Sequence, residues 1–394
     1  MSKPSVPRDV TKVAFLAACV LACPQPLAAA STAAVAQLPT EQDAPIALLV
    51  DLTSGQTLFA RQADRRFAPA SIAKVMTAYT AFEQIKQGKI SLTQSLPVRP
   101  DTFAQWSRVG STMYLPNGAR PSVNQLLVGI TTVSANDGAV VLAEGAAGSV
   151  AEWLRLMNGN ARALGMRDSR FSTPNGWPDG GETYTTARDL VKLAEATVTR
   201  HPQLYKAYFG HRTFTYNGIT QRNHDPITGR VPGADGLKTG YTDAAGFGFL
   251  GSAERDGRRL AMVVAASDTS AARDRAARAL MEWGFARYEA HRLLPARQPI
   301  AEAKVQGGAV RSVGLVTGGP LTITTLRGTA PAVRMKVRYD GPLQAPLQRG
   351  APYALLEVRV DGMPPYTVPL LAAQDVPGAN ALQRTLNGAI GWIS

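Results

Sequence analysis

Cysteine and histidine are scarce in this sequence, and their scarcity excludes several kinds of site. The two cysteines among the 394 residues, Cys19 and Cys23, both lie near the N-terminus. Two cysteines exclude a scaffold held by several disulfides and a cysteine-ligated zinc module. No two histidines stand at the i,i+4 spacing of a helical metal site, so we expect neither a metal nor a cofactor. The four histidines are His201, His211, His224 and His291.

The N-terminus also lacks a hydrophobic run long enough to span a bilayer. The apolar run Val13–Ala22 is shorter than the roughly 20 apolar residues of a spanning helix. A basic segment precedes it and the small residues Ala28–Ala30 follow it, which is the order of a secretory signal peptide. We therefore predict a signal peptide over residues 1–30 and a linker over residues 31–42. Both cysteines end short segments that resemble lipobox patterns, which leaves a lipoprotein signal as an alternative.

Acidic residues are fewer than basic ones. The chain has 42 Lys and Arg against 29 Asp and Glu, and its formal net charge is +13. An exported protein meets no cellular nucleic acid, so we expect no nucleic-acid partner. A basic surface outside the cell instead favours anionic wall polymers or anionic lipid headgroups.

Apolar periodicity predicts alternating strands and helices through most of the chain. Gly55 lies at the tip of a predicted hairpin, and Thr186–Asp189 has the capping-box form that starts a helix. The predicted helices cover Ser71–Ile85, Gln125–Ala143, Val150–Ala163 and Arg273–Tyr288. The predicted strands cover Ala47–Asp51, Thr57–Ala60, a region from Tyr241 to Phe249, Gly246–Gly251 and Leu260–Ala265.

After His291 the pattern changes to alternation with period two. Such half-buried strands predict a small β-sandwich over residues 298–376, with the domain boundary at 291–298. The last segment, residues 379–394, has apolar residues on one helical face. It fits a packed helix or an amphipathic membrane anchor, and Arg384 as its only basic residue weakens the anchor interpretation.

Ser71-Ile-Ala-Lys74 is the first motif with chemical meaning. It is the only place in the chain where Lys follows Ser by three positions. At the start of a helix these two side chains share one face. A serine hydroxyl is a weak nucleophile and needs a base, and lysine serves as one only if burial or a second cation keeps it neutral.

Two further motifs have residues suited to holding a peptide. Lys238-Thr-Gly240 precedes a predicted strand, where its side chains suit a carboxylate and its backbone N–H suits an oxyanion. The pattern S-x-N occurs twice. Ser122-Val-Asn124 is explained by a capping box with Gln125, whereas Ser134-Ala-Asn136 follows an apolar helix and presents a hydroxyl and an amide at its end.

The order S-x-x-K, S-x-N, K-T-G is far more specific than any one of the motifs. With it, the chain resembles the low-molecular-mass penicillin-binding proteins, which are serine-type D-Ala-D-Ala carboxypeptidases. The resemblance covers nearly the whole chain after the signal peptide. The similar segments are Ala68–Thr77, Ser134–Gly138, Phe171–Trp177, Thr185–Leu190, Asp235–Thr242 and Glu282–Phe285.

This resemblance implies an architecture and a location. Residues 43–290 would form the catalytic domain, a mixed α/β (α+β) transpeptidase domain of the penicillin-binding and β-lactamase type, with an antiparallel sheet and helices. The all-β domain and a membrane-surface anchor would follow. The protein would be exported to the periplasm and lie peripherally at the outer face of the cytoplasmic membrane. Its partners would be peptidoglycan pentapeptides and, as covalent inhibitors, β-lactam antibiotics.

The resemblance also implies catalytic roles. Ser71 would attack the carbonyl of the penultimate D-Ala, with Lys74 as the general base. Ser134 would pass the proton to the leaving D-Ala amine, and Asn136 would bind the peptide amide. The backbone N–H groups of Ser71 and Tyr241 would form the oxyanion hole.

A second group of residues is expected to hold the substrate. Lys238 and Thr239 of the Lys238–Gly240 motif, with Gly240 beside them, would engage the terminal carboxylate. Arg273 and Arg222 match two basic positions of the family, and His224 beside Arg222 is expected to be structural. Tyr241 stands where some relatives have His, a change that the backbone role tolerates.

Three competing functions remain open at this point. A β-lactamase needs a glutamate-activated water, but residues 165–174 contain no Glu, and Glu182 lies in no matching motif. A D,D-endopeptidase shares all the motifs, although its relatives commonly lack the C-terminal β-domain. A non-catalytic wall-binding protein is disfavoured because the motifs are intact. We therefore expect a carboxypeptidase that penicillins acylate and that deacylates slowly.

Overall fold

The computed structural model describes residues 37–380. They divide into two compact units. The N-terminal unit comprises the chain up to Leu52 and Thr57–Ala286, and the C-terminal unit comprises the chain from Arg287 onward together with the turn Thr53–Gln56. The predicted signal peptide, part of the predicted linker and most of the predicted terminal helix lie outside the described residues. Within residues 37–380, no helix combines the length and the apolarity needed to cross a membrane.

A five-stranded sheet forms the centre of the N-terminal unit. Its strands are β1 (Ile46–Asp51), β2 (Gln56–Arg61), β5 (Ala234–Thr242), β6 (Gly246–Arg255) and β7 (Arg258–Ser267). Their order is β2-β1-β7-β6-β5, with antiparallel pairing from β1 through β7 and β6 to β5. A separate hairpin consists of β3 (Thr213–Tyr216) and β4 (Ile219–Arg222). Strand β5 is therefore an edge strand of the sheet, with one side free for other contacts.

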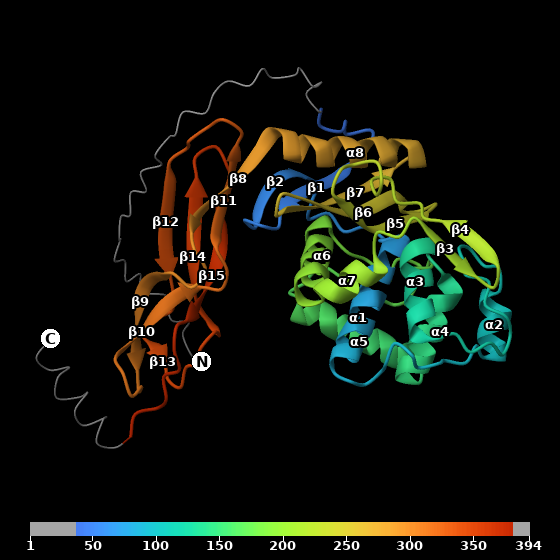
Figure 1. Cartoon of the computed structure of the whole chain (residues 1–394), viewed down its shortest axis with the longest axis horizontal. Coiled ribbons are helices and arrows are strands. Elements are labelled where there is room, and N and C mark those ends of the chain that lie inside the picture. The colour runs from blue at the N-terminus through green and yellow to red at the C-terminus, as the bar shows by residue number, and fades with distance from the viewer. Residues whose placement is uncertain (1–36, 381–394) are drawn as a thin grey trace, which may run out of the picture. The chain divides into compact units, whose positions relative to one another are not determined.

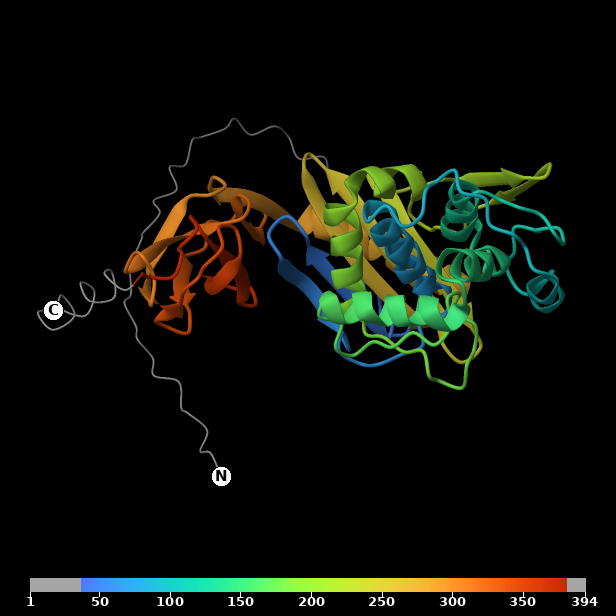
Figure 2. The ribbon, with the colours of Figure 1, turned by 90° about the horizontal axis from the view of Figure 1, so that it is seen from below.

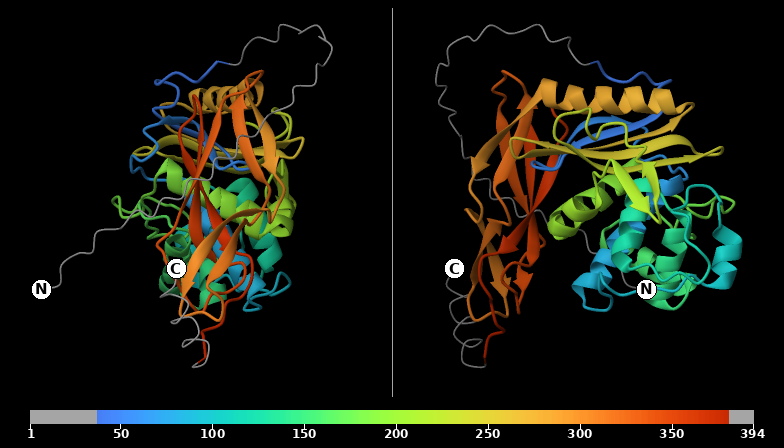
Figure 3. Two further views of the ribbon diagram at one scale, coloured as in Figure 1. Left: turned by 90° about the vertical axis from the view of Figure 1, so that its left-hand side faces the viewer. Right: turned by 45° about the vertical axis from the view of Figure 1, so that its right-hand side comes forward.

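Helices cover both faces of this sheet. Helix α8 (Ser270–Arg287) lies on one face, and the other helices lie on the opposite face (Figure 1; Figure 3, right). The latter begin with a short 3-10 turn, η1 (Ala70–Ala73). The helices that follow are α1 (Lys74–Lys86), α2 (Pro100–Trp106), α3 (Val123–Val133), α4 (Asn136–Ala147), α5 (Val150–Ala163), α6 (Ala187–Arg200) and α7 (Pro202–Tyr208).

Helix α1 is the central helix of the unit. Figure 2 shows it (blue) among the green helices that cover the same face of the sheet. Every residue from Lys74 to Phe82 is buried, including the apolar Val75, Met76 and Tyr79. Because this part of α1 is buried on all sides, it fixes the Ser71–Lys74 segment within the core.

Much of the predicted secondary structure is confirmed. The β1–β2 hairpin forms around Gly55, and Thr186 caps α6 by accepting a hydrogen bond from the Asp189 backbone N–H. Ser122 and Gln125 make the predicted capping box at the start of α3. β6 and β7 are joined at Asp256–Gly257, as expected.

Two predictions are wrong in their boundaries. The single helix predicted over Gln125–Ala143 is two helices, because Ser134 takes a left-handed backbone conformation (φ 64°) that ends α3. The strand predicted from Tyr241 to Phe249 is also divided. β5 already contains Lys238–Gly240 and ends at Thr242, and β6 begins at Gly246 after a turn.

The C-terminal unit is all β, as predicted, and Figure 3 shows its strands in orange to red. Its strands are β8 (Tyr288–Leu294), β9 (Pro299–Gln306), β10 (Ser312–Thr317), β11 (Leu321–Leu326), β12 (Val333–Arg338), β13 (Leu343–Gln344), β14 (Pro352–Val360) and β15 (Tyr366–Ala372). Six of them form a sheet in the order β12-β14-β15-β10-β9-β13, and β8 pairs with β11. Leu321 and Ile323 of β11 share one core with Leu315, Leu356 and Leu370 of the larger sheet. The unit thus has its own hydrophobic core.

Candidate active site

The nucleophile candidate Ser71 lies at a strained turn ahead of α1. Ala70 before it has a positive φ of 49°, which costs about 1–2 kcal/mol for a residue with a Cβ. Ser71 belongs to the η1 turn, and Lys74 is the first residue of α1. This i,i+3 spacing brings the Ser71 Oγ to 2.8 Å from the Lys74 Nζ, as the sequence predicts.

Lys74 is buried beside Ser71 and fixed by two further hydrogen bonds. Its side chain is 1% exposed, and its Nζ donates hydrogen bonds to the Asn136 Oδ1 and to the Asn175 carbonyl oxygen, both at 2.7 Å. A neutral amine has two N–H groups and one lone pair. Because two obligate acceptors take the N–H groups, the lone pair remains for the Ser71 hydroxyl proton. Burial, with a further contribution from the positive charge of Lys238, holds the pKa of Lys74 well below its usual value.

The break between α3 and α4 presents the second motif. Ser134 is the left-handed residue that ends α3, and Asn136 is the first residue of α4. The Asn136 backbone N–H donates to the Ser111 carbonyl at 2.8 Å, and its Nδ2 donates to the Val109 carbonyl at 3.1 Å. Asp137 accepts hydrogen bonds from the backbone N–H groups of Met113 and Leu115. The segment 109–115 is therefore attached to the start of α4.

The third motif lies on β5, at the edge of the sheet. Gly240 faces the nucleophile turn so closely that a Cβ on it would lie 2.6 Å from the Pro69 carbonyl oxygen. The outer side of β5 therefore runs beside Ser71, while its inner side pairs with β6. Lys238 is 4% exposed, and burial together with the charge of Arg273 lowers its pKa to about 7. Near neutral pH it therefore titrates between an ammonium and an amine.

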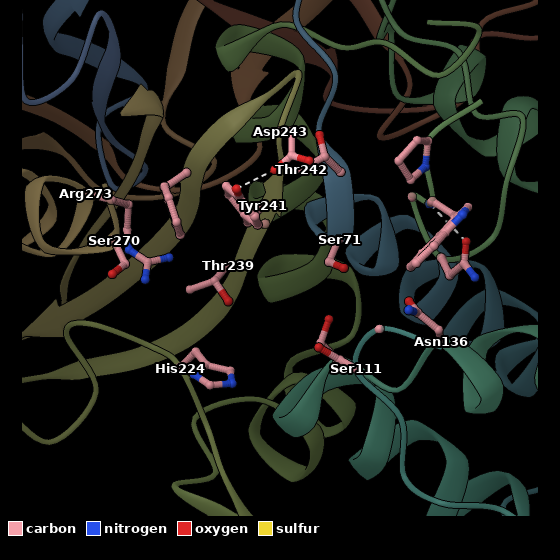
Figure 4. Close-up of a pocket in the computed structure, with 18 residues that line it drawn as sticks. Ser71, Ser111, Asn136, His224, Thr239, Tyr241, Thr242, Asp243, Ser270 and Arg273 are labelled. Carbon is pink, nitrogen blue, oxygen red and sulfur yellow. Dashed lines mark hydrogen bonds between the residues drawn. The ribbon is translucent and has the colours of Figure 1, made fainter. Parts of the chain in front are cut away.

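These motifs converge on one cavity of about 540 Å³ (Figure 4). Ser71 lies between the β5 residues Thr239 and Tyr241 on one side and Asn136 on the other. Lys74 and Lys238 are buried and are not among the lining residues. The predicted residues that line the cavity are Ser71, Ser134, Asn136, Thr239, Gly240, Tyr241 and Arg273.

The two arginine candidates differ in burial and in position relative to the cavity. Arg273 is 5% exposed, lines the cavity and donates to the Gly248 carbonyl and the Asp274 carboxylate. Arg222 is exposed at the end of β4 and does not line the cavity. His224, which we expected to be structural, lines the cavity instead. Burial and the charges of Lys238 and Arg273 lower its pKa, which favours the neutral imidazole.

A turn at residues 173–177 completes the site, and its role was not recognised from the sequence. Asn175 supplies the carbonyl that accepts from Lys74, and Gly176 has a φ of 73°. A Cβ on Gly176 would lie 1.9 Å from the Ala70 carbonyl oxygen, so the turn packs directly against the nucleophile turn. The Thr77 hydroxyl donates to the Pro174 carbonyl and joins the same turn to α1.

No glutamate is among the residues that line this cavity, so none is placed there to activate a water. Glu182 is exposed and pairs with Arg170 at 3.2 Å, and it is not among the residues that line the cavity. Asp243, at the end of β5, is the only carboxylate among the lining residues. Residues 37–380 also contain no cluster of three or more His, Cys, Asp or Glu side chains suited to a metal ion.

Known proteins are similar over both units. The family model described as D-alanyl-D-alanine carboxypeptidase matches residues 31–269, and the model described as penicillin-binding protein 5, C-terminal domain, matches residues 288–378. The D-alanyl-D-alanine carboxypeptidase DacA of Escherichia coli is 32% identical over 343 residues, which are 86% of this chain and 85% of that protein.

Solved structures have the same fold. Penicillin-binding protein 5 from Haemophilus influenzae matches with a TM-score of 0.74 and 31% identity, over 86% of this chain and 99% of that one. Penicillin-binding protein D2 from Listeria monocytogenes, in its cefotaxime-bound form, matches with a TM-score of 0.57 and 30% identity, over 63% of this chain and 100% of that one. Together with the Ser71–Lys74 pair in its cavity, these similarities identify the chain as a member of the D-alanyl-D-alanine carboxypeptidase family of low-molecular-mass penicillin-binding proteins, with a penicillin-binding protein 5 C-terminal domain.

Proposed function

We propose that this enzyme removes the terminal D-Ala from peptidoglycan pentapeptides through an acyl-enzyme on Ser71. The observation that carries the proposal is the position of the Lys74 amine. It is buried, its pKa is lowered, its two N–H groups have fixed acceptors, and it lies 2.8 Å from the Ser71 Oγ. A nucleophile with a base already in contact is the requirement of covalent acyl transfer.

Acylation then uses Ser71, the buried Lys74 and groups that line the cavity. The Ser71 Oγ attacks the carbonyl carbon of the penultimate D-Ala while its proton moves to the Lys74 Nζ. The backbone N–H groups of Ser71 and Tyr241 stabilise the oxyanion. The C–N bond to the terminal D-Ala breaks as the Ser134 hydroxyl gives its proton to the leaving nitrogen, and the proton on Lys74 restores Ser134.

Deacylation needs only water and the same base. Water attacks the ester carbonyl and gives a proton to Lys74, the bond from carbon to the Ser71 Oγ breaks, and the proton returns to that oxygen. Charge recognition of the terminal carboxylate is assigned to Lys238 and Arg273, with Thr239 as a neutral donor. This assignment is supported by Thr239 and Arg273, which line the cavity, and by Lys238, which is buried next to Thr239 in β5.

β-Lactams should acylate Ser71, and the resulting acyl-enzyme should be hydrolysed slowly. The cefotaxime-bound relative supports the first part, since its chain is 30% identical to this one. The second part is supported by the position of Glu182, which pairs with Arg170 outside the cavity. Nitrocefin turnover as fast as that of a dedicated β-lactamase would contradict this part of the proposal.

The location is proposed from the sequence pattern and the charge. A basic start, a short apolar run and small residues at 28–30 support export by a cleaved signal peptide. Residues 31–394 have a formal net charge of +11, which supports residence in the periplasm, at the anionic outer face of the cytoplasmic membrane. Fractionation of cells that express the full chain, compared with a variant lacking residues 2–30, tests this. Equal recovery of both forms in the cytoplasm would contradict it.

The activity is tested with a muramyl pentapeptide and the Ser71→Ala variant. The wild-type protein should release free D-Ala and bind fluorescent penicillin covalently, and the variant should do neither. Release by both proteins, or by neither, would refute the assignment. A cross-linked peptide dimer as second substrate separates carboxypeptidase from endopeptidase activity, because only the latter converts the dimer to monomers.

A further inference from the structure

A second cavity, of about 430 Å³, lies in the C-terminal unit, and we call it the C-terminal cavity. None of its lining residues has a role in the proposed mechanism at Ser71. Two of them belong to loops, Arg297 between β8 and β9 and Arg349 between β13 and β14. The full lining consists of Arg297, Val316, Thr317, Gly318, Arg349, Gly350, Leu371, Ala372 and Ala373.

All the charge in this lining is positive. Arg297 and Arg349 are the charged residues among those that line the cavity, and both side chains are exposed. Neither forms an ion pair with a carboxylate of residues 37–380. Two guanidinium groups beside one cavity, without an acid in its lining, favour an anionic ligand there.

The acids of the C-terminal unit are engaged elsewhere. Its arginine ion pairs include Arg327–Glu289, Arg334–Asp361, Arg338–Glu357 and Arg359–Glu357. Asp375 follows the lining residue Ala373 closely in sequence, but it does not line the cavity itself. Its carboxylate accepts a hydrogen bond from the Arg349 backbone N–H at 2.7 Å, so it fixes the loop that contains this arginine.

Both arginines belong to segments whose backbones are attached to the sheet. The Arg297 N–H donates to the Thr317 carbonyl of β10 at 3.2 Å, and Arg297 itself has a φ of 58°. The N–H of Gly350, next to Arg349, donates to the Ala372 carbonyl of β15 at 2.9 Å. Since β10 and β15 are neighbouring strands, these contacts hold the two arginine backbones beside the same part of the sheet.

That part of the sheet has an apolar surface. Val316 of β10 is paired with Leu371 of β15, and both are half-buried. Each lies between two buried residues of its strand, so both point to the face of the sheet opposite the core. A cavity of 430 Å³ is within the size range of sites for small organic ligands, so it holds an organic group as well as an anion.

We propose that the C-terminal cavity binds a phosphate ester. The guanidinium groups of Arg297 and Arg349 bind the phosphate oxygens, because the planar fork of arginine matches phosphate geometry. The organic group of the ester packs against Val316 and Leu371. This site is separate from the chemistry at Ser71 and does not depend on it.

Isothermal titration calorimetry of the full chain with three soluble ligands tests the ligand class. n-Butyl phosphate should bind about tenfold more tightly than inorganic phosphate, the effect of burying roughly two methylene groups. It should also bind more tightly than pentanoate, which has the same alkyl chain, because a phosphate monoester has a charge of about −1.5 to −2 at neutral pH. Binding should weaken in 1 M salt, where the Debye length is about 3 Å.

Variants assign the binding to the two arginines. Arg297→Gln and Arg349→Gln should each raise the Kd for n-butyl phosphate by about tenfold, the effect of losing one charge-assisted hydrogen bond. Arg334→Gln is the matched control, because it removes the same charge from an exposed arginine that pairs with Asp361 and does not line the cavity. It should keep the wild-type Kd. All three variants should keep the wild-type thermal unfolding and penicillin acylation, since the substituted side chains are exposed.

A vesicle experiment identifies the source of the phosphate. The wild-type chain, the double variant Arg297→Gln/Arg349→Gln and Arg334→Gln are sedimented with phosphatidylglycerol vesicles. Loss of binding in the double variant beyond that of Arg334→Gln would support the proposal with a lipid headgroup as the ligand. Equal sedimentation of all three, together with weakened binding of n-butyl phosphate by the double variant, would support it with a soluble ester as the ligand.

Two results would overturn the proposal. Binding of n-butyl phosphate that Arg297→Gln and Arg349→Gln leave unchanged, or its absence in the wild-type chain, would exclude the C-terminal cavity as the site. Pentanoate binding as tight as that of n-butyl phosphate would exclude phosphate as the preferred group.

Discussion

Two buried lysines near one serine are the chemical centre of this molecule. Burial lowers the pKa of both, and each cation opposes the charge of its neighbour, Lys238 on Lys74 and Arg273 on Lys238. In the proposed mechanism the two lysines need opposite protonation states, since Lys74 would accept a proton and Lys238 would attract a carboxylate. A charged Lys238 favours the neutral form of Lys74, because two nearby cations repel each other.

This difference predicts how substrate binding depends on pH. Lys238 is protonated below its pKa of about 7 and loses its charge as the pH rises through that value. The KM for a D-Ala-D-Ala peptide should therefore rise above pH 7, by about tenfold for the loss of one charge-assisted hydrogen bond. Initial rates of D-Ala release between pH 5.5 and about 9 measure this, a range set by the shifted lysines.

The Lys238→Arg variant is the control for that pH dependence. Arginine keeps its charge over the whole range, so the KM of this variant should stay flat between pH 6 and about 9. In both proteins kcat should fall as the pH drops through the lowered pKa of Lys74, because a protonated amine accepts no proton. The same rise in KM for Lys238→Arg would show that another group titrates.

Gly176 gives a second residue-scale prediction, with a matched control four residues away. Gly176 and Gly180 both have a φ of 73°, but a Cβ on Gly176 would lie 1.9 Å from the Ala70 carbonyl oxygen, whereas nothing lies within 4 Å of one on Gly180. Gly180→Ala should cost about 1–2 kcal/mol for its backbone conformation alone. Gly176→Ala should cost about 1–3 kcal/mol more because of the steric clash.

Urea unfolding and the rate of penicillin acylation measure the effect of these glycines. Gly176→Ala should acylate more slowly even under conditions in which it is folded, because the clash displaces the turn that holds Lys74. Gly180→Ala should acylate at the wild-type rate. Equal acylation rates for the two variants would contradict a role for this turn in the site.

At the scale of elements, the sequence predicts those parts of the fold that depend on local pattern. The Ser122–Gln125 capping box, the Thr186 cap and the hairpin at Gly55 each have a short-range signal, and all are present. Apolar periodicity does not indicate the break at Ser134, because the apolar pattern continues through it and the residue is not glycine, so only the S-x-N motif suggests a helix end there. Tertiary contacts of Asn136 with Ser111 and Val109 fix the break instead.

The same limit explains which site residues the sequence predicted. Ser71, Lys74, Asn136 and Lys238 belong to motifs whose side chains have roles in the proposed mechanism. Asn175 was missed as a partner of Lys74 because the contact uses its backbone carbonyl, although the Asn-Gly pair at 175–176 does indicate a turn. The family resemblance indicates Arg222 as a substrate-binding residue and leaves His224 as structural, but the structure places the histidine at the cavity and the arginine in solvent.

Substitutions of Ser134, at the break between α3 and α4, should affect stability and activity differently. Ser134 has a φ of 64°, so Ser134→Gly relieves a strained backbone that Ser134→Ala retains. The glycine variant should be more stable than the alanine variant by about 1 kcal/mol. Both should lose most D-Ala release, since both lack the hydroxyl that returns the proton to the leaving amine. Thermal unfolding and product assays on the two variants test this, and full activity in either would exclude Ser134 from proton transfer.

At the scale of the whole molecule, each of the two units within residues 37–380 buries hydrophobic residues of its own. Those of the N-terminal unit lie between its helices and the five-stranded sheet, and those of the C-terminal unit lie among its strands. Ser71 and the residues that line its cavity all belong to the first unit. A covalent ligand on Ser71 should therefore directly change the stability of the N-terminal unit only.

Calorimetry of the described part of the chain, residues 37–380, should resolve this as two unfolding transitions. Covalent penicillin on Ser71 should raise the Tm of one transition, because the ligand adds contacts to the folded N-terminal unit alone. Leu48→Ala, in the first core, should lower that same transition. Leu356→Ala, in the second core, should lower the other, each at a cost of about 2–5 kcal/mol. If penicillin and both substitutions instead shift one common transition, the two units unfold cooperatively, and the C-terminal domain stabilises the active site as well as its own strands.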